Sequence, residues 1–360
     1  MIDFLIIGGG IAGISAAARL SKLGQTTLLE AEDSLAFHAS GRSAAMFEES
    51  YGNRATIALN KMSRAHHEAA QVLSPRGLLL VGGPEDADRF ATDQRQMKLA
   101  RITVDEAVEM VPILRRDRID RAAYHADAWD IDTDKLIQGF AKEARQNGTQ
   151  ISTKSPVTSI NRIPTGWEVN TSFGSYFAKN LVNAAGAWVD EVAVMANVAP
   201  LGFTPLRRSM ARIPAPGGHD LRKWPMMFGP GESWYAKPDA GALIVSPADE
   251  DPVKPHDACA LELPLAEGLM RYENNVTEKL VRLLATWAGL RTFAPDRALV
   301  LGPDPLDEHF IWCAGQGGYG MQTSPAASKL LADLVAGRPP ALDVSTLAAL
   351  TPGRLRSVAA

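Results

Sequence analysis

The chain has 360 residues, of which 46% are hydrophobic and 22% charged, and its formal net charge is −4. This length predicts one large domain or two closely joined domains with a sizeable core. The composition is ordinary for a globular protein and excludes a disordered or fibrous one. The small negative charge offers no basic excess, so no nucleic-acid partner is expected.

The N-terminal run MIDFLIIGGG contains an acid at position 3 and only a short apolar stretch before three glycines. It fits neither a secretory signal nor a membrane span, so we expect a cytoplasmic protein with no transmembrane segment. Cys259 and Cys313 form no CxxC pair. No iron–sulfur, zinc or other metal site is therefore expected, and both thiols are expected to be reduced and buried.

The first thirty residues alternate between strand-like and helical patterns. Residues 2–7 are mostly apolar, residues 11–23 carry helix-forming Ala, Leu and Lys, and residues 26–30 are again strand-like. This order predicts a βαβ unit.

The turn after the first strand carries the pattern GxGxxG as Gly8, Gly10 and Gly13, and Glu30 ends the next strand. Such glycines allow a tight turn and close approach of backbone to a pyrophosphate, and the acid accepts bonds from ribose hydroxyls. An ordinary turn is the alternative, and the motif alone does not separate FAD from NAD. The expected dinucleotide contacts here are Gly8, Gly10, Ile11, Ala12, Gly13, Glu30 and Ala31.

Farther along, residues 132–148 have an N-capping Asp or Thr, helical apolar spacing and a terminal Gly, which predict a helix. Alternating stretches over 157–182 predict strands. The segments 76–134 and 206–290 are richer in Pro, Trp and Met and contain strand-like runs such as ALIVS at 242–246.

From Phe310 the pattern is a strand, a glycine-rich turn and a helix from about Pro325 to Val335. The whole order predicts a nucleotide-binding domain interrupted twice by a substrate domain. Its expected parts are residues 1–75, 135–205 and 291–360 for the nucleotide-binding domain, with 76–134 and 206–290 for the substrate domain.

Five further motifs occur in order along the chain: SGRSAA (40–45), VNAAGAW (182–188), WYAKPDAG (234–241), WAGLRTFAPD (287–296) and AGQGGYGMQTS (314–324). With these motifs the chain resembles the D-amino acid oxidase and glycine oxidase superfamily of flavoenzymes, and within it the bacterial FAD-dependent D-arginine dehydrogenases. The resemblance implies non-covalently bound FAD and oxidation of an amino acid to an imino acid. It also implies an α/β fold, in which a Rossmann-like FAD-binding domain is interrupted by a smaller α+β substrate domain with a mainly antiparallel sheet.

Small residues in these motifs let backbone amides approach a flat ring, as bulky side chains do not. Cys313, in the strand FIWCAG, is expected to be a core cysteine rather than a site of covalent flavin attachment. The remaining expected FAD contacts are Gly41, Arg42, Ser43, Ala44, Ala45, Val157, Ala185, Gly186, Trp188, Gly315, Gly317, Gly318, Tyr319, Gly320, Met321, Gln322 and Thr323.

The resemblance places two arginines at the substrate carboxylate. Arg291 matches the family arginine that forks onto it, and the planar guanidinium suits that bidentate contact. A structural ion pair with Asp296 is the alternative. Arg208 matches a second family arginine, but its neighbour Arg207 leaves a solvated charge pair as the alternative.

Tyr51 and Tyr235 match tyrosines that close over the substrate, and a buried tyrosine needs a hydrogen-bond partner such as a carboxylate. Core or rim aromatics are the alternative. The resemblance also implies that Gly318 and Gln322 contact substrate or flavin.

Two positions depart from the dehydrogenases. Met46 stands where they have a histidine near the reacting amine, and methionine neither accepts a proton nor donates a hydrogen bond. Leu78 stands where they have a glutamate that pairs with the substrate guanidinium. An unpaired cation against apolar groups costs several kcal/mol. A basic substrate side chain is paired only if the carboxylate of Glu48 or Glu49 turns into the pocket.

The side-chain pocket, expected to contain Met46, Leu78, Met226, Phe228 and Met321, therefore favours a D-amino acid with a neutral or apolar side chain over D-arginine. The imino product hydrolyses to the 2-oxo acid and ammonia. The alternatives are oxidation of a secondary amine or a 2-hydroxy acid, or a non-catalytic FAD-binding subunit of a larger dehydrogenase. The amino acid is a small-molecule partner, and either oxygen or a quinone is the electron acceptor.

Overall fold

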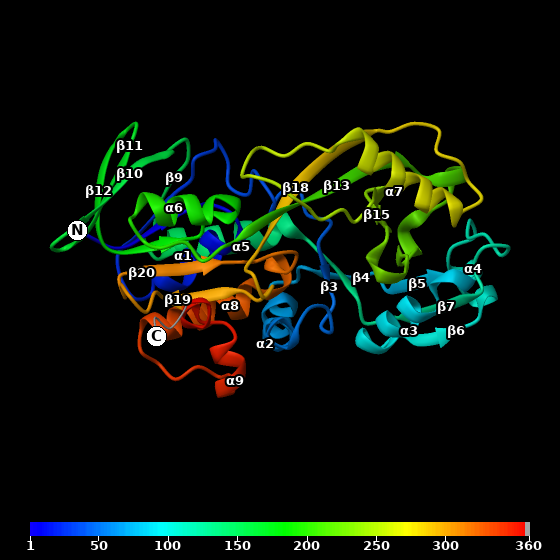
Figure 1. The fold of residues 1–360 in the computed structure, drawn as a ribbon, viewed down its shortest axis with the longest axis horizontal. Coiled ribbons are helices and arrows are strands. Elements are labelled where there is room, and N and C mark those ends of the chain that lie inside the picture. The colour runs from blue at the N-terminus through cyan, green and yellow to red at the C-terminus, as the bar shows by residue number, and fades with distance from the viewer. Residues whose placement is uncertain (357–360) are drawn as a thin grey trace.

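The computed structural model describes residues 1–356, and Figure 1 shows two large sheets lying side by side along the long axis. Within these residues the first sheet has eight strands in the order β10-β11-β12-β1-β2-β9, with β20 paired to β12 and β19 to β20. Its strands are β1 (Ile2–Ile7), β2 (Thr26–Leu29), β9 (Gln150–Ser152), β10 (Val157–Ile163), β11 (Gly166–Thr171), β12 (Gly174–Asn183), β19 (Val300–Pro303) and β20 (Phe310–Ala314).

The centre of the first sheet is parallel, because β1 pairs in parallel with both β2 and β12, and β12 with β20. The βαβ unit predicted at the N-terminus is confirmed, with its helix α1 at Ile11–Leu20. The strands predicted over 157–182 are also confirmed, as the antiparallel meander β10-β11-β12.

Helices cover both faces of this sheet (Figure 1). The helix α1 packs against α5 (Thr133–Gln146) and α8 (Gly320–Val335), and α8 packs against α2 (Arg54–Ala69). On the other face, α6 (Val189–Met195) packs against β12. The predicted N-cap of α5 is confirmed, since the Asp132 carboxylate accepts from the Lys135 amide at 2.9 Å. The short α9 spans Val344–Ala348.

The predicted start of the C-terminal helix at Pro325 is wrong, because α8 already begins at Gly320. A proline inside a helix lacks the amide that bonds back to the carbonyl four residues earlier. Here that carbonyl, on Met321, instead accepts the Ser324 hydroxyl at 3.3 Å. The glycine-rich turn therefore runs directly into the helix.

The second sheet has nine strands in the described part of the chain, ordered β17-β13-β16-β15-β14-β5-β7-β6, with β18 paired to β13. All its neighbouring pairs are antiparallel except β5 with β14. Its strands are β5 (Leu78–Gly82), β6 (Ala100–Ile102), β7 (Arg121–His125), β13 (Thr204–Pro214), β14 (Met226–Phe228), β15 (Tyr235–Asp239), β16 (Ala242–Ser246), β17 (Asp251–Pro252) and β18 (Ala285–Phe293).

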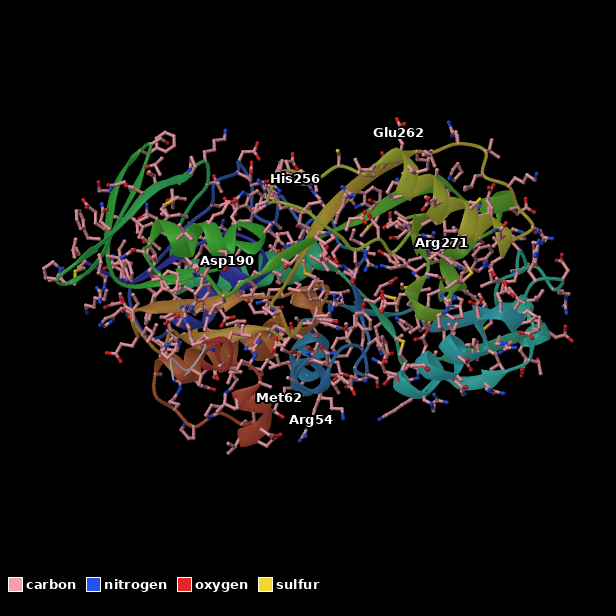
Figure 2. All side chains as sticks on the ribbon, in the orientation of Figure 1. Arg54, Met62, Asp190, His256, Glu262 and Arg271 are labelled. Atoms are coloured by element: carbon pink, nitrogen blue, oxygen red, sulfur yellow. The ribbon has the colours of Figure 1, made fainter. Side chains whose placement is uncertain are left out.

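The helices beside the second sheet are α3 (Ala87–Gln96), α4 (Val104–Met110) and α7 (Glu262–Asn274). Figure 2 labels Glu262 and Arg271 on α7, and the Arg271 guanidinium bonds inward to the carbonyls of Ser233 and Pro247 at 2.8 and 3.1 Å. A third, three-stranded sheet joins β3 (Met46–Phe47), β8 (Trp129–Ile131) and β4 (Leu73–Pro75).

The fold class expected from the sequence is confirmed: a mixed α/β chain in which a largely parallel sheet stands beside a mainly antiparallel one. The long paired strands β13 and β18 run from one sheet region to the other (Figure 1). The domain boundaries stay a prediction. Within residues 1–356, no helix combines the length and apolar character required to cross a bilayer.

Alternation along the strands of the second sheet decides which side chains reach the centre of the molecule, because successive side chains point to opposite faces. Leu79, Met227 and Ala236 belong to the core on one face. Their neighbours on the same three strands form a separate apolar cluster on the other face: Leu78, Leu80, Met226, Phe228 and Tyr235.

Candidate active site

A large cavity opens between the N-terminus of α1, the loop over residues 39–48, the inner face of the second sheet and the glycine-rich turn before α8. It encloses about 1540 Å³ of space not filled by protein atoms, including its open mouth. Segments far apart in the sequence meet there, as is usual for a ligand site.

Most residues expected from the sequence to form the site border this one cavity. The expected residues that line it are Gly10, Ile11, Ala12, Arg42, Ser43, Ala44, Ala45, Met46, Tyr51, Leu78, Gly186, Arg208, Met226, Phe228, Tyr235, Arg291, Gly315, Gly317, Gly318, Gly320, Met321 and Gln322. Expected residues that do not line it are Gly8, Gly13, Glu30, Ala31, Gly41, Val157, Ala185, Trp188, Tyr319 and Thr323. Their expected roles at the cofactor stay predictions.

The N-terminus of α1 is shaped for close approach. Gly8 has φ +107°, and a Cβ on it would overlap the Ala184 carbonyl, while a Cβ on Gly13 would overlap the Gly8 carbonyl. The helix begins at Ile11, with Gly10 as its N-cap and without an acid in its first turn, and the Ile11 amide donates to Ser40 Oγ at 3.0 Å. The first-turn amides of a helix beside a cavity suit an anion such as a pyrophosphate.

Glu30 already makes two backbone bonds. Its Oε2 accepts from the Gly9 amide at 2.6 Å, and its Oε1 accepts from the Glu32 amide at 2.8 Å. These bonds hold the glycine turn against the end of β2. A carboxylate has further lone pairs, so this geometry remains compatible with ribose hydroxyls.

Arg291 lies on β18 and borders the cavity, where its side chain is half-buried. Burial opposes its charge, but the neighbouring Tyr51, Tyr235 and Glu232 outweigh burial and hold its pKa above the ordinary value. The ion-pair alternative is wrong, because Asp296 instead bonds to Arg354, with Nε and Oδ2 2.7 Å apart. Within the described residues Arg291 forms no salt bridge, so its donors are available to a ligand.

Arg207 and Arg208 are both buried, with exposed fractions of 7% and 2%, so the solvated-pair alternative is wrong. Arg208 borders the cavity, and its Nη2 donates to Glu250 Oε1 at 2.9 Å. Arg207 lies outside the cavity lining and binds Asp251 at 2.7 Å. The Nε and Nη1 atoms of Arg208 have no hydrogen-bond acceptor among the described residues.

The two expected tyrosines face the same space. Tyr235 is buried, and its hydroxyl has no hydrogen-bond partner within residues 1–356. The Tyr51 hydroxyl donates to Glu232 Oε2 at 3.2 Å, and Arg208 Nη1 lies 3.9 Å from the same oxygen. Burial, followed by the charge of Glu232, raises the pKa of Tyr51. Tyr51 therefore remains a neutral hydrogen-bond donor at physiological pH.

Four of the expected pocket residues form an apolar wall: Leu78, Met226 and Phe228 from the second sheet, and Met46 from β3. Met321 borders the cavity from the first turn of α8. Sequence reasoning missed Met97 and Met210, which also line it. No local pattern marks them, because only the packing of α3 and β13 brings them there.

Two acids also line the cavity. Glu232 was missed, because its turn, PGES, resembles any surface turn. The sequence left open whether Glu48 turns inward, and in the structure it lines the cavity with an exposed fraction of 4%. Glu49 instead bonds to Arg64 at 3.4 Å and does not border the cavity. The alternation of side chains along the extended segment after Met46 is the signal that identifies Glu48.

The two cysteines differ in their burial. Cys313 is buried, as expected, and its Sγ lies 3.6 Å from the Ala12 carbonyl. Burial raises the pKa of its thiol to about 12. The expectation that Cys259 is buried is wrong, because this residue is exposed in the segment before α7. That segment lies at the surface, where a residue's own hydrophobicity does not decide its burial.

These features fit a flavin dinucleotide. The N-terminus of α1 suits its pyrophosphate, and Gly289, Gly315 and Gly317 line the same cavity without side chains that would keep backbone from a flat ring. Arg42 lies along the same wall, donating to the carbonyls of Ala258 and Ala288 at 2.9 and 3.0 Å.

Comparison with known proteins agrees with this fit. Residues 3–334 match the family model DAO, described as FAD dependent oxidoreductase. Dimethylglycine dehydrogenase of Rattus norvegicus mitochondria is 26% identical over 373 residues, which cover 94% of this chain but only 43% of that protein. The N-methyl-L-tryptophan oxidase of Salmonella agona is 25% identical over 385 residues, covering 98% of both chains.

Solved structures show the same fold. Glycine oxidase from Geobacillus kaustophilus superposes with a TM-score of 0.81 at 23% identity, covering 96% of this chain and 97% of that one. L-proline dehydrogenase from P. horikoshii has a TM-score of 0.82 at 20% identity, covering 98% and 97%. The chain therefore belongs to the DAO family of FAD-dependent oxidoreductases, and FAD is its cofactor.

Proposed function

We propose that this protein oxidises the carbon–nitrogen bond of a D-amino acid with a neutral or apolar side chain. The product is the imino acid, which water hydrolyses to the 2-oxo acid and ammonia. One observation supports this most: the half-buried Arg291 borders the cavity near Tyr51 and Tyr235, without a salt bridge in the described structure. An unpaired guanidinium in a cavity wall is suited to a ligand carboxylate.

In this proposal FAD, held along the N-terminus of α1 and the glycine-rich turn before α8, would supply the hydride-accepting chemistry, and the protein's own residues supply orientation and charge. Arg291 binds the substrate carboxylate in a bidentate manner, and the free Nε and Nη1 donors of Arg208 add to the positive field. The Tyr235 hydroxyl donates to the same carboxylate, and the Tyr51 hydroxyl does so when it turns from Glu232 to the substrate. Gly318 and Gln322 complete the wall on the side of α8.

The side-chain preference comes from the apolar wall. Leu78, Met226 and Phe228 stand together on one face of the second sheet, and Met46 packs against them. Moving an apolar substrate side chain from water to this wall is favourable, whereas a guanidinium placed against the same groups loses its hydration without a compensating partner. Glu48 also turns into this cavity, but it is assigned below to the substrate amine and not to a side-chain cation, so neutral and apolar substrates are favoured over D-arginine.

Oxidation of a secondary or tertiary amine is a second candidate. Dimethylglycine dehydrogenase and N-methyl-L-tryptophan oxidase are among the relatives, and the solved structures of this fold include an iminodiacetate oxidase from Chelativorans sp.. A cavity with Met46 on its wall accommodates an N-methyl group without burying an unpaired polar atom. This candidate keeps Arg291 as the carboxylate-binding group.

Anaerobic mixing with a panel of compounds, followed by flavin absorbance, tests both candidates. The panel contains D-leucine, D-methionine, D-arginine, L-leucine, N-methylated amino acids and a 2-hydroxy acid. Bleaching by D-leucine or D-methionine supports the proposal, and a clear preference for D-arginine contradicts its side-chain assignment. Faster bleaching by N-methyl compounds selects the second candidate, and a flavin that no compound bleaches indicates a non-catalytic subunit. Admitting air then separates oxygen from a quinone as acceptor.

A further inference from the structure

Glu48 is the buried acid that faces the cavity beside its apolar wall. It follows β3, in which Met46 lines the cavity while the next residue, Phe47, is fully buried in the core. Side chains two residues apart in an extended segment point the same way. Glu48 therefore returns to the cavity side, and its own lining of the cavity agrees with this.

The two oxygens of this carboxylate differ in their bonding. Oε1 accepts from the Ser50 amide at 2.8 Å, and the Glu48 amide donates to Gln322 Oε1 at 3.2 Å, so the residue is anchored at both ends. Oε2 is buried and has no hydrogen-bond donor among the described residues. The polar side chain beside Oε2 is the His125 imidazole, so this oxygen can still accept a hydrogen bond from a ligand.

His125 gives this oxygen a route to solvent. Its Nε2 lies 3.3 Å from Glu48 Oε2, and its side chain is 28% exposed, whereas that of Glu48 is 5% exposed. The imidazole stands at the end of β7, opposite Leu78 on β5. The chain of groups thus runs from the cavity through Glu48 to a histidine at the surface.

The charged groups around Glu48 allow it to accept a proton near neutral pH. Burial raises the pKa of its carboxyl to about 7; the Ser50 amide bond opposes this shift, the charges of Asp127 and Glu49 add to it, and Arg64 opposes it. His125 is the further titratable group in contact with it. A carboxylate with a pKa near the working pH is suited to general base catalysis.

We propose that Glu48 is a catalytic residue, which takes a proton from the substrate ammonium group and passes it to His125. This proposal rests on the proposed function, because an amino acid enters the cavity with a protonated amine and must lose that proton before its Cα–H bond is oxidised. An N–H bond of the ammonium breaks and an O–H bond forms on Glu48 Oε2. The proton then moves to His125 Nε2 and on to solvent, so charge and atoms balance.

Glu232, the other acid in the cavity, is less suited to this role. Its Oε2 already accepts from Tyr51 and lies 3.9 Å from Arg208 Nη1, so it is engaged by the groups proposed to bind the substrate carboxylate. Its side chain is also 42% exposed, so solvent screens it. Glu48 is the better proton acceptor because its free oxygen is buried and faces no arginine in the described cavity wall.

The test compares pH profiles of kcat/KM for the wild type, Glu48→Gln and the matched control Glu49→Gln, using the panel compound that best reduces the flavin. The wild type is expected to rise up to about pH 7 and then level off. In Glu48→Gln only free-base amine reacts, so kcat/KM is expected to fall about 100-fold at pH 7.5 and to rise about tenfold per pH unit above it. Glu49→Gln should keep the height and shape of the wild-type profile, with its rise moved to lower pH because the charge of Glu49 adds to the pKa of Glu48.

A His125→Gln variant tests the second transfer. Losing a surface relay slows proton exit without removing the base, so the expected loss is smaller than in Glu48→Gln. Rescue by high concentrations of imidazole buffer should restore the rate, which a purely structural defect would not allow. A Glu48→Gln profile that matches the wild type overturns the proposal.

A binding measurement separates this proposal from the proposed function. The matched ligands are D-leucine and 4-methylpentanoate, which share a carboxylate and an alkyl chain but differ in the amine. Their affinities are measured from the change in flavin absorbance on binding under anaerobic conditions. For D-leucine the change is read before the flavin is reduced, and 4-methylpentanoate does not reduce it. The preference of the wild type for the amine-bearing ligand above pH 7 should fall about tenfold or more in Glu48→Gln, even if no compound reduces the flavin. An unchanged preference overturns the assignment of Glu48.

Discussion

The guanidinium of Arg291 lies directly against Gly318. A Cβ on Gly318 would stand 3.0 Å from both the guanidinium carbon and Nη1 of Arg291. One residue belongs to β18 and the other to the turn before α8, so two distant segments position the proposed carboxylate-binding group together. The absence of a side chain at position 318 is what leaves room for the arginine.

Replacing Gly318 with alanine is expected to displace the Arg291 guanidinium by a few tenths of an ångström or more. Because bidentate binding depends on alignment, KM for the carboxylate substrate should rise about tenfold or more, with FAD still bound. Steady-state kinetics and flavin content measure both effects. Gly139→Ala is the control, because a Cβ there meets nothing within 4 Å and lies inside α5. An unchanged KM in Gly318→Ala would show that this contact does not position the arginine.

Replacing Glu232 with glutamine is expected to tighten carboxylate binding. The carboxylate of Glu232 holds the Tyr51 hydroxyl and lies beside Arg208, so its charge competes with an incoming anion. Its partial exposure screens the effect, and a fall in Kd of a few-fold at low salt is expected. Titration with 4-methylpentanoate measures it, with the exposed acid Glu262 on α7 as the Glu262→Gln control. Weaker binding would mean that Glu232 orients Tyr51 productively.

The stability difference between the wild type and Glu48→Gln is expected to depend on pH. Burial raises the pKa of Glu48 from 4.5 to about 7, so the folded wild type holds this proton more tightly than the unfolded chain. The bound proton stabilises the fold fully below pH 4.5, and this contribution is lost as pH rises through about 7. The free energy of unfolding then falls by something on the order of 3 kcal/mol. Glutamine does not titrate. Urea unfolding from pH 4 to 8 should therefore show the free energy of unfolding of Glu48→Gln increasing relative to that of the wild type as pH rises. Parallel plots of this free energy against pH would contradict the raised pKa of Glu48.

Replacing Lys237 with methionine should weaken both the fold and FAD retention. The Lys237 ammonium, 9% exposed, bonds to the carbonyls of Ala44 and Ala45 in the cavity wall and lies 3.0 Å from Asp130 Oδ1. Removing the ammonium leaves the two carbonyls without this donor, while Asp130 keeps its pair with Arg76 at 2.6 Å, so the expected cost is about 1–3 kcal/mol. Thermal unfolding and FAD dissociation measure the loss. Lys179→Met, at an exposed pair with Asp3, should cost less than about 1 kcal/mol. Equal effects in both variants would contradict a special role for Lys237.

Acid precipitation should release the flavin into solution. Burial raises the pKa of the Cys313 thiol to about 12, so it stays protonated at neutral pH and is a poor nucleophile toward a flavin ring. Absorbance of the supernatant and pellet after precipitation measures the partition. Cys313→Ala should release the same fraction. A yellow pellet in the wild type and a colourless one in this variant would demonstrate a covalent bond.

Short-range patterns in the sequence were enough to predict several features. The βαβ unit and its glycine turn, the cap of α5 at Asp132 and the strands over 157–182 each depend on residues close together in the chain. Such elements are predictable because hydrophobic period and capping chemistry act within a few residues. Even here one boundary was wrong, since a side-chain hydroxyl next to Pro325 compensates for its missing amide bond.

Sequence alone thus determined the family motifs, the dinucleotide turn and the types of residue available for a carboxylate site. Only the tertiary structure decided how they are used. Arg354 pairs with Asp296, so Arg291 stays free to bind a ligand in the cavity. Of the two neighbouring arginines, Arg208 lines the cavity and Arg207 does not. Of the two neighbouring acids, Glu48 lines the cavity and Glu49 does not. Ion-pair partners and burial depend on which distant strands and helices pack together, and no local pattern encodes that packing.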